Sequence, residues 1–114
     1  VIIAFQDEKN LNEIISNMKF LRYTDWTIHN QKKLFQEYKS IKNCGYAVCN
    51  EEMENLVMGI AAPIFDYKNE VKSSICILGL KSSFKGKKLN AVINTVLDAA
   101  DKISEEWSRI KNRE

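Results

Sequence analysis

Two apolar runs joined by a short polar turn decide the fold of this chain. Residues 56–80 read LVMGIAAPIF, then DYKNE, then VKSSICILGL. Apolar runs that are rich in Val and Ile and bounded by Asp, Asn and Lys are typical of a β-hairpin. We therefore predict strands over residues 56–65 and 71–80, joined by a tight turn.

Neither face of this predicted hairpin is clearly polar, so both faces need a cover. Successive side chains of a strand point to opposite faces, and one face collects small residues: Gly59, Ala61, Ser74 and Cys76. We expect one face to pack on long helices. Small residues on the other face leave volume that a bound molecule could fill. They would also admit a closely packed helix, and the pattern alone leaves both interpretations open.

Helical periodicity flanks the hairpin on both sides. Apolar residues recur at helical spacing in three segments: Leu11 to Met18, Leu34 to Ile41, and Leu89 to Ile110. Asp7 and Asn30 precede the first two segments and are residue types that cap helix N-termini, and Gly45 supplies the stop of the second.

The remaining segments connect these elements. Residues 21–27 mix aromatic and β-branched side chains and predict a short strand or an extended connection. Residues 45–49 predict a short strand that ends at an acidic turn, residues 50–52. We find no repeat and no Pro/Gly/Ser-rich linker, so the sequence predicts one α+β domain over residues 1–114.

Composition excludes several classes of protein. Of 114 residues, 45% are hydrophobic and 28% charged, with 17 Lys and Arg against 15 Asp and Glu, which is the balance of an ordinary soluble domain. No apolar run reaches the roughly 18 residues of a membrane span. The net charge of +2 is too small to predict a nucleic-acid binder. The chain starts with Val1 inside an apolar stretch, so we expect it to be an excerpt of a longer protein.

The three cysteines indicate the compartment. Cys44 and Cys49 have the spacing C-x4-C, which is not the C-x2-C of zinc sites, and the single histidine, His29, is distant in the sequence. An odd number of cysteines in a chain of this size favours thiols in a reducing cytoplasm over disulfides. We predict a cytoplasmic protein with no bound metal.

Short motifs along the chain resemble one family. Residues 45–48 read GYAV, residues 51–52 EE, and residues 59–66 GIAAPIFD. A Thr-x-x-Thr pair, Thr24 and Thr27, precedes them, and AADKIS at residues 99–104 follows. In this order, the motifs resemble the C-terminal effector-binding domain of the IclR-type transcription regulators.

The resemblance implies a GAF-like antiparallel sheet with helices packed on one face and a ligand pocket on the other. It implies a non-enzymatic domain without a cofactor, which binds a small-molecule effector and forms homodimers or homotetramers. Operator DNA would be bound only by a winged helix-turn-helix domain that this chain lacks. Residues 1–5 resemble the helix that follows a glycine-containing effector-binding loop, so the domain is expected to be partial.

The resemblance also implies which residues face the pocket: Cys49, Val57, Gly59, Cys76 and Leu78. Members that bind small carboxylates have an acidic residue at the position of Cys49, a thiol at that of Gly59, and hydroxyls at those of Cys76 and Leu78. Because those hydroxyl donors are missing here, we expect an organic acid of larger size or a less polar metabolite.

The sequence leaves two alternatives open. The domain could be a GAF-like oligomerisation module without an effector, or a redox sensor that uses Cys49 and Cys76. A reactive thiol needs a nearby base or cation, and His29 is expected in a loop. The pair Glu51 and Glu52 is interpreted as charges of a turn, because adjacent strand residues point to opposite faces.

Overall fold

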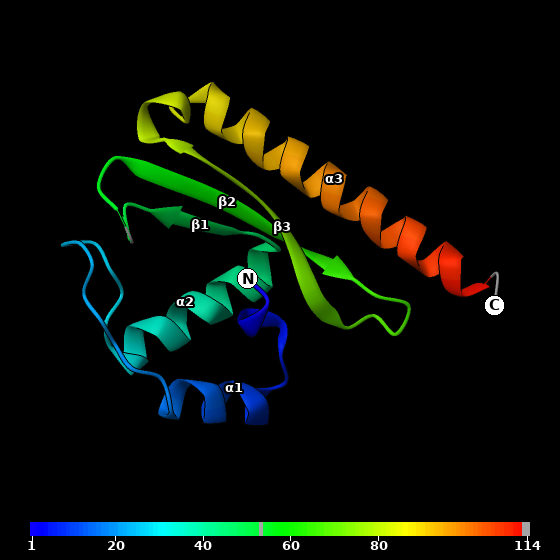
Figure 1. Ribbon diagram of the computed structural model, residues 1–114, viewed down its shortest axis with the longest axis horizontal. Helices are drawn as coiled ribbons and strands as arrows, with labels where there is room; N and C mark the ends of the chain where they lie inside the picture. The colour runs from blue at the N-terminus through cyan, green and yellow to red at the C-terminus, as the bar shows by residue number, and fades with distance from the viewer. Residues whose placement is uncertain (53, 113–114) are drawn as a thin grey trace.

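A three-stranded antiparallel sheet lies at the centre of the computed structural model, which describes residues 1–52 and 54–112. The strands β1 (Ala47–Asn50), β2 (Val57–Phe65) and β3 (Val71–Leu80) lie in the order β1-β2-β3. The long helix α3 (Lys87–Asn112) follows one face of the sheet, and α1 (Glu8–Ser16) and α2 (Gln31–Cys44) lie on the other side (Figure 1). Two short 3-10 turns, Ile3–Phe5 and Lys81–Ser83, complete the fold. The expected α+β architecture is confirmed, and α2 additionally lies across the open face.

The hairpin agrees with the sequence except at one end. β2 and β3 pair from Val57 opposite Leu80 to Phe65 opposite Val71, with one irregularity between Ile64 and Phe65. β2 begins at Val57 instead of Leu56, because Leu56 has a φ of 65° and its backbone is therefore left-handed.

The helix ends follow their caps. The side chains of Asp7 and Asn30 accept hydrogen bonds from the N–H groups of Asn10 and Lys33, at 2.9 and 2.8 Å. Gly45, with a φ of 86°, ends α2 in the left-handed conformation, so β1 begins at Ala47 and not at Gly45.

Residues 21–27 contain two bends and a short turn but no strand, so of the two predicted alternatives the strand is wrong and the connection is confirmed. The hydroxyl of Thr27 accepts hydrogen bonds from the N–H groups of Tyr23 and Thr24, at 3.2 and 3.0 Å. Because these N–H groups bond to a nearby side chain, they are not available to pair with another strand. The β-branched and aromatic composition therefore does not produce a strand here.

The core lies between β2 and α3. Met58, Ile60, Ala62 and Ile64 alternate along β2 and are buried against Ile93, Val96 and Ala100 of α3 and against Phe84. Trp107 packs against this cluster from the predicted apolar stripe of the helix. Burial of each large side chain stabilises the fold by about 1.5–3 kcal/mol. No helix in the described part of the chain is both long and apolar enough to cross a membrane.

The turn between β2 and β3 is closed by the buried carboxylate of Asp66. Its Oδ1 accepts hydrogen bonds from the N–H groups of Lys68 and Glu70, both at 2.9 Å, and Lys72 Nζ lies 3.8 Å from Oδ2. The bond from Glu70 is the main reason that the pKa of Asp66 lies below its usual range, and the bond from Lys68 and the charge of Lys72 act in the same direction.

Asp66→Asn should therefore reduce the loss of stability on acidification. A carboxyl whose pKa is lowered by folding stabilises the protein above its unfolded pKa, about 3.9, and this contribution disappears as the pH falls through the lower folded pKa. Asparagine keeps an oxygen at the Oδ1 position but has no charge. Urea unfolding at pH 7 and pH 2.5 should show a smaller difference for Asp66→Asn than for the wild type. The control is Asp98→Asn on the exposed face of α3, and an equal pH effect in both variants would contradict the assignment.

Candidate functional site

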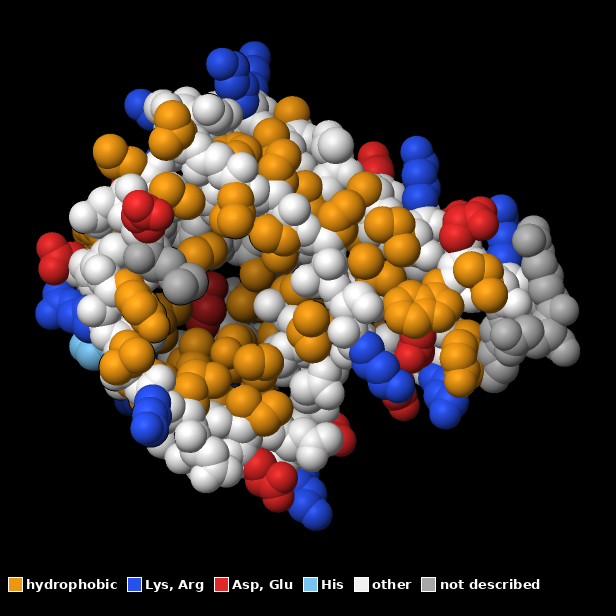
Figure 2. All heavy atoms as spheres, in the orientation of Figure 1, with side chains coloured by type: hydrophobic (Ala, Val, Ile, Leu, Met, Phe, Trp, Pro, Cys, Tyr) orange, Lys and Arg blue, Asp and Glu red, His pale blue; other side chains and the backbone are white. Residues whose placement is uncertain are grey.

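A cavity of about 260 Å³ lies between the open face of the sheet and α2. Its floor comes from all three strands: Ala47 and Cys49, Gly59 and Ala61, Cys76 and Leu78. Its opposite wall comes from α2: Leu34, Glu37, Tyr38 and Ile41. Figure 2 shows a hollow between these elements, surrounded mostly by hydrophobic side chains and with an acidic side chain at its edge.

The strand register explains how distant residues meet at this floor. Cys49, Gly59 and Leu78 lie opposite one another and form one row across the three strands. Ala47, Ala61 and Cys76 form a second such row, two residues further along each strand. Rows separated by two residues share a face of the sheet, because side chains alternate. The three strands thus present six cavity-lining residues on one surface.

Four of the five predicted pocket residues line this cavity: Cys49, Gly59, Cys76 and Leu78. Val57 shares their face, but it lies at the start of β2 opposite Leu80 and is not among the lining residues. Contact of any of these five residues with a ligand stays a prediction.

Gly59 gives the floor its shape. A Cβ atom at this position would lie 2.6 Å from Cδ2 of Leu78, which is closer than carbon atoms approach each other. The absent side chain therefore lets Leu78 lie over β2. Because Leu78 is 68% exposed, its side chain has room to move if the floor is changed.

Glu52 is a pocket residue that sequence reasoning missed. Glu51 behaves as the turn charge that was expected, since its Oε1 lies 3.2 Å from Lys81 Nζ. Glu52 is half-buried and lines the cavity. The two glutamates are fixed by the threonine pair, because the hydroxyls of Thr24 and Thr27 donate to the backbone oxygens of Glu51 and Glu52 respectively.

The polar wall of the cavity is acidic. Burial raises the pKa of Glu52, the nearby Glu37 raises it further, and a hydrogen bond with the Cys49 side chain opposes both effects. The pKa of Tyr38 is also raised, first by burial and then by the charge of Glu52. Among the described lining residues there is no lysine, arginine or histidine side chain.

The geometry provides little for thiol or metal chemistry. His29 is exposed ahead of α2, with its Nδ1 3.0 Å from the backbone oxygen of Thr27, and is not among the residues that line the cavity. Within residues 1–52 and 54–112, no disulfide joins the cysteines and no group of three His, Cys, Asp or Glu residues could hold a metal ion.

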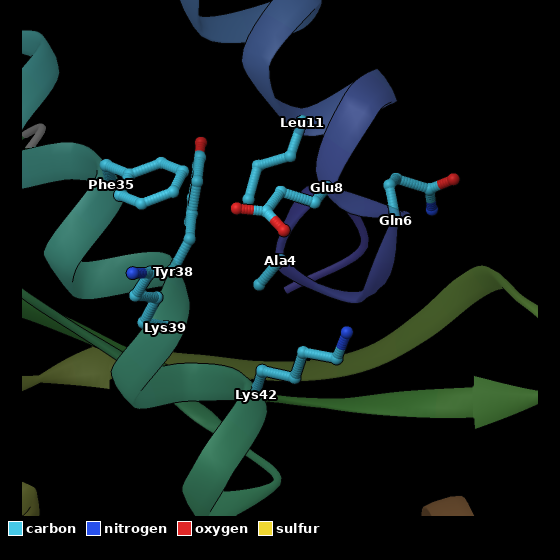
Figure 3. A pocket seen from close by; sticks show the side chains of 8 residues that line it. All are labelled: Ala4, Gln6, Glu8, Leu11, Phe35, Tyr38, Lys39 and Lys42. Atoms are coloured by element: carbon cyan, nitrogen blue, oxygen red, sulfur yellow. The ribbon is translucent and has the colours of Figure 1, made fainter.

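A second cavity, also of about 260 Å³, lies on the other side of α2. Figure 3 shows its lining, in which Tyr38 and Phe35 of α2 face Leu11 and Glu8 of α1. Long exposed side chains such as Lys39 and Lys42 form much of its wall. None of the five predicted residues lies there. A pocket with an apolar floor and few polar groups is the more typical ligand site, so the cavity against the sheet is the candidate.

Comparison with known proteins identifies relatives of this architecture. The family model described as "Bacterial transcriptional regulator IclR C-terminal" matches residues 1–105. The HTH-type transcriptional regulator KipR of Bacillus subtilis is 31% identical over 103 residues, which are 90% of this chain and 41% of KipR. This chain thus spans about two fifths of the length of that relative.

Two crystal structures have the same fold. The Thermotoga maritima IclR superposes with a TM-score of 0.88 at 32% identity, over 94% of this chain and 43% of that one. The C-terminal domain of the Escherichia coli regulator KdgR gives a TM-score of 0.87 at 26% identity, over 94% of this chain and 66% of that one.

Proposed function

This chain belongs to the IclR family of bacterial transcriptional regulators, as part of their C-terminal domain, and we propose that it senses a small-molecule effector. The observation that carries the proposal is the cavity between the sheet and α2. Four of the five residues that the motifs indicate as pocket-facing line it, although they come from three different strands.

The proposed mechanism is a shift between conformations. The cavity is bounded on one side by the sheet and on the other by α2, so a ligand that fills it favours the conformation in which these two elements have the matching separation. In the whole regulator, this preference would change the arrangement of the DNA-binding domains, and the coupling would act in both directions.

The remaining assignments follow from this role. We infer a protein without catalytic activity that acts in the cytoplasm, where the operator DNA is, as a homodimer or homotetramer. The cavity supports only the lack of catalytic activity, because its thiols, Cys49 and Cys76, have no histidine among the described residues of its wall to activate them.

The function is tested by a thermal-shift screen of the protein against aromatic acids, sugar acids, alcohols and amines of increasing size. A ligand at 100 times its Kd stabilises the folded state by about 2.7 kcal/mol, which corresponds to a shift of several degrees. We expect such a shift with at least one class that fits a cavity of about 260 Å³. The absence of any shift across the whole panel would favour the oligomerisation module without an effector.

A further inference from the structure

The acidic wall of the cavity constrains the chemistry of its ligand. Glu37 reaches the cavity from α2 and Glu52 from the turn between β1 and β2, so two carboxylates from different elements line one space. They are close enough for Glu37 to affect the protonation of Glu52. The other ionisable side chains in the described wall are the Tyr38 hydroxyl and the thiols of Cys49 and Cys76.

None of these side chains carries a positive charge that would attract an anion. A carboxylate of a ligand placed at this wall would meet two like charges in a partly dehydrated space, which is unfavourable. A hydroxyl, amide or amine would instead donate a hydrogen bond to an acceptor-only carboxylate, which is among the stronger polar contacts in proteins.

The position of Glu52 is fixed before any ligand arrives. Its backbone oxygen accepts a hydrogen bond from the hydroxyl of Thr27, and its side chain is hydrogen-bonded to that of Cys49 in the floor. Thr24 holds the preceding residue, Glu51, in the same way. An acceptor held from both the loop before α2 and the strand β1 binds a donor with little loss of side-chain freedom.

We propose, on the basis of the sensing function proposed above, that the ligand directs a hydrogen-bond donor at Glu52 and Glu37. The effector class is therefore a small metabolite with a hydroxyl, amide or amine at the end that faces α2, on a carbon skeleton that packs against Gly59 and Ala61. A carboxylate is excluded from that end. Glu52 is the residue that determines this specificity.

The test uses two series of ligands with constant skeletons. The first is benzoate, benzamide, benzyl alcohol and benzylamine, and the second is the phenylacetate series with the same four end groups. Dissociation constants are measured at pH 7 by ligand-observed NMR at millimolar concentrations, so that weak binding is detected. For the wild type, we expect donor-bearing members of a series to bind at least tenfold more tightly than the acid.

Glu52→Gln should abolish this preference, because glutamine is uncharged and can both donate and accept. The amine should lose about tenfold in affinity and the acid should gain. Glu54→Gln, an exposed carboxylate in the same turn, is the matched control and should behave as the wild type. If Glu52→Gln does not fold, Glu37→Gln on α2 is used instead, and it should likewise reduce the preference for donor-bearing ligands over the acid.

The outcomes separate the two proposals. If the acid binds most tightly and Glu52→Gln leaves the order unchanged, the assignment of the donor end is wrong, but the sensing function stands. If no member of either series binds the wild type, the proposed ligand class fails, and the thermal-shift screen described above decides separately on the sensing function.

Discussion

Gly59→Leu is expected to weaken ligand binding by roughly 10- to 100-fold while the domain stays folded. Gly59 lies at the centre of the cavity floor, and even a Cβ atom there would displace the end of Leu78. A leucine side chain would project from the floor into the space that the ligand needs. Overfilling a packed site costs about 1–3 kcal/mol, and each 1.4 kcal/mol is a tenfold change in affinity.

The fold should tolerate this change because the strain is local. The atom that must move is the end of a flexible and largely exposed side chain, and the residues of β2 that pack on α3 lie on the opposite face. Gly59→Ala should have a smaller effect in the same direction. Ala91→Leu on the exposed face of α3 adds the same side chain away from the cavity and serves as the control.

The measurement compares thermal shifts and dissociation constants of these three variants with a ligand from the screen. Wild-type affinity in Gly59→Leu, with an unchanged circular dichroism spectrum, would mean that the ligand binds elsewhere. The cavity between α1 and α2 would then be the next candidate.

The parts of the fold that depend on local chemistry were predictable from the sequence. The hairpin and the caps Asp7, Asn30 and Gly45 are determined by residues close in sequence, and the structure confirms them, with β2 starting at Val57 instead of Leu56. The exact first residues of β1 and β2 were not predictable. They depend on the left-handed backbone angles of Gly45 and Leu56, which a pattern of hydrophobic residues does not encode.

The sequence predicted which residues share the face of the sheet that lines the cavity, but not which charged side chain lies beside them. Alternation along β2 and β3 correctly places Gly59, Cys76 and Leu78 on one face, since the period of a strand is fixed. The position of Glu52 follows instead from hydrogen bonds that Thr24 and Thr27 donate to the backbone oxygens of Glu51 and Glu52, which lie 27 and 25 residues later in the sequence. Such contacts join segments far apart in the sequence, so adjacency alone suggested only a turn charge.

Ile60→Ala is expected to cause the largest loss of stability among the variants considered. Ile60 is completely buried at the centre of β2, within the cluster that joins the sheet to α3. Removing buried carbon atoms of isoleucine and leaving a cavity costs about 2–5 kcal/mol, a large part of the roughly 5–15 kcal/mol that stabilises a domain. The melting temperature should fall by roughly 10 °C or more.

The cross-strand neighbour Ile77 provides an internal comparison. Ile77 lies directly opposite Ile60 in the register and on the same face, but it is 41% exposed whereas Ile60 is completely buried. Ile77→Ala removes the same atoms and should cost clearly less in urea unfolding. If the two variants lose equal stability, the packing of α3 on β2 would not be the main core.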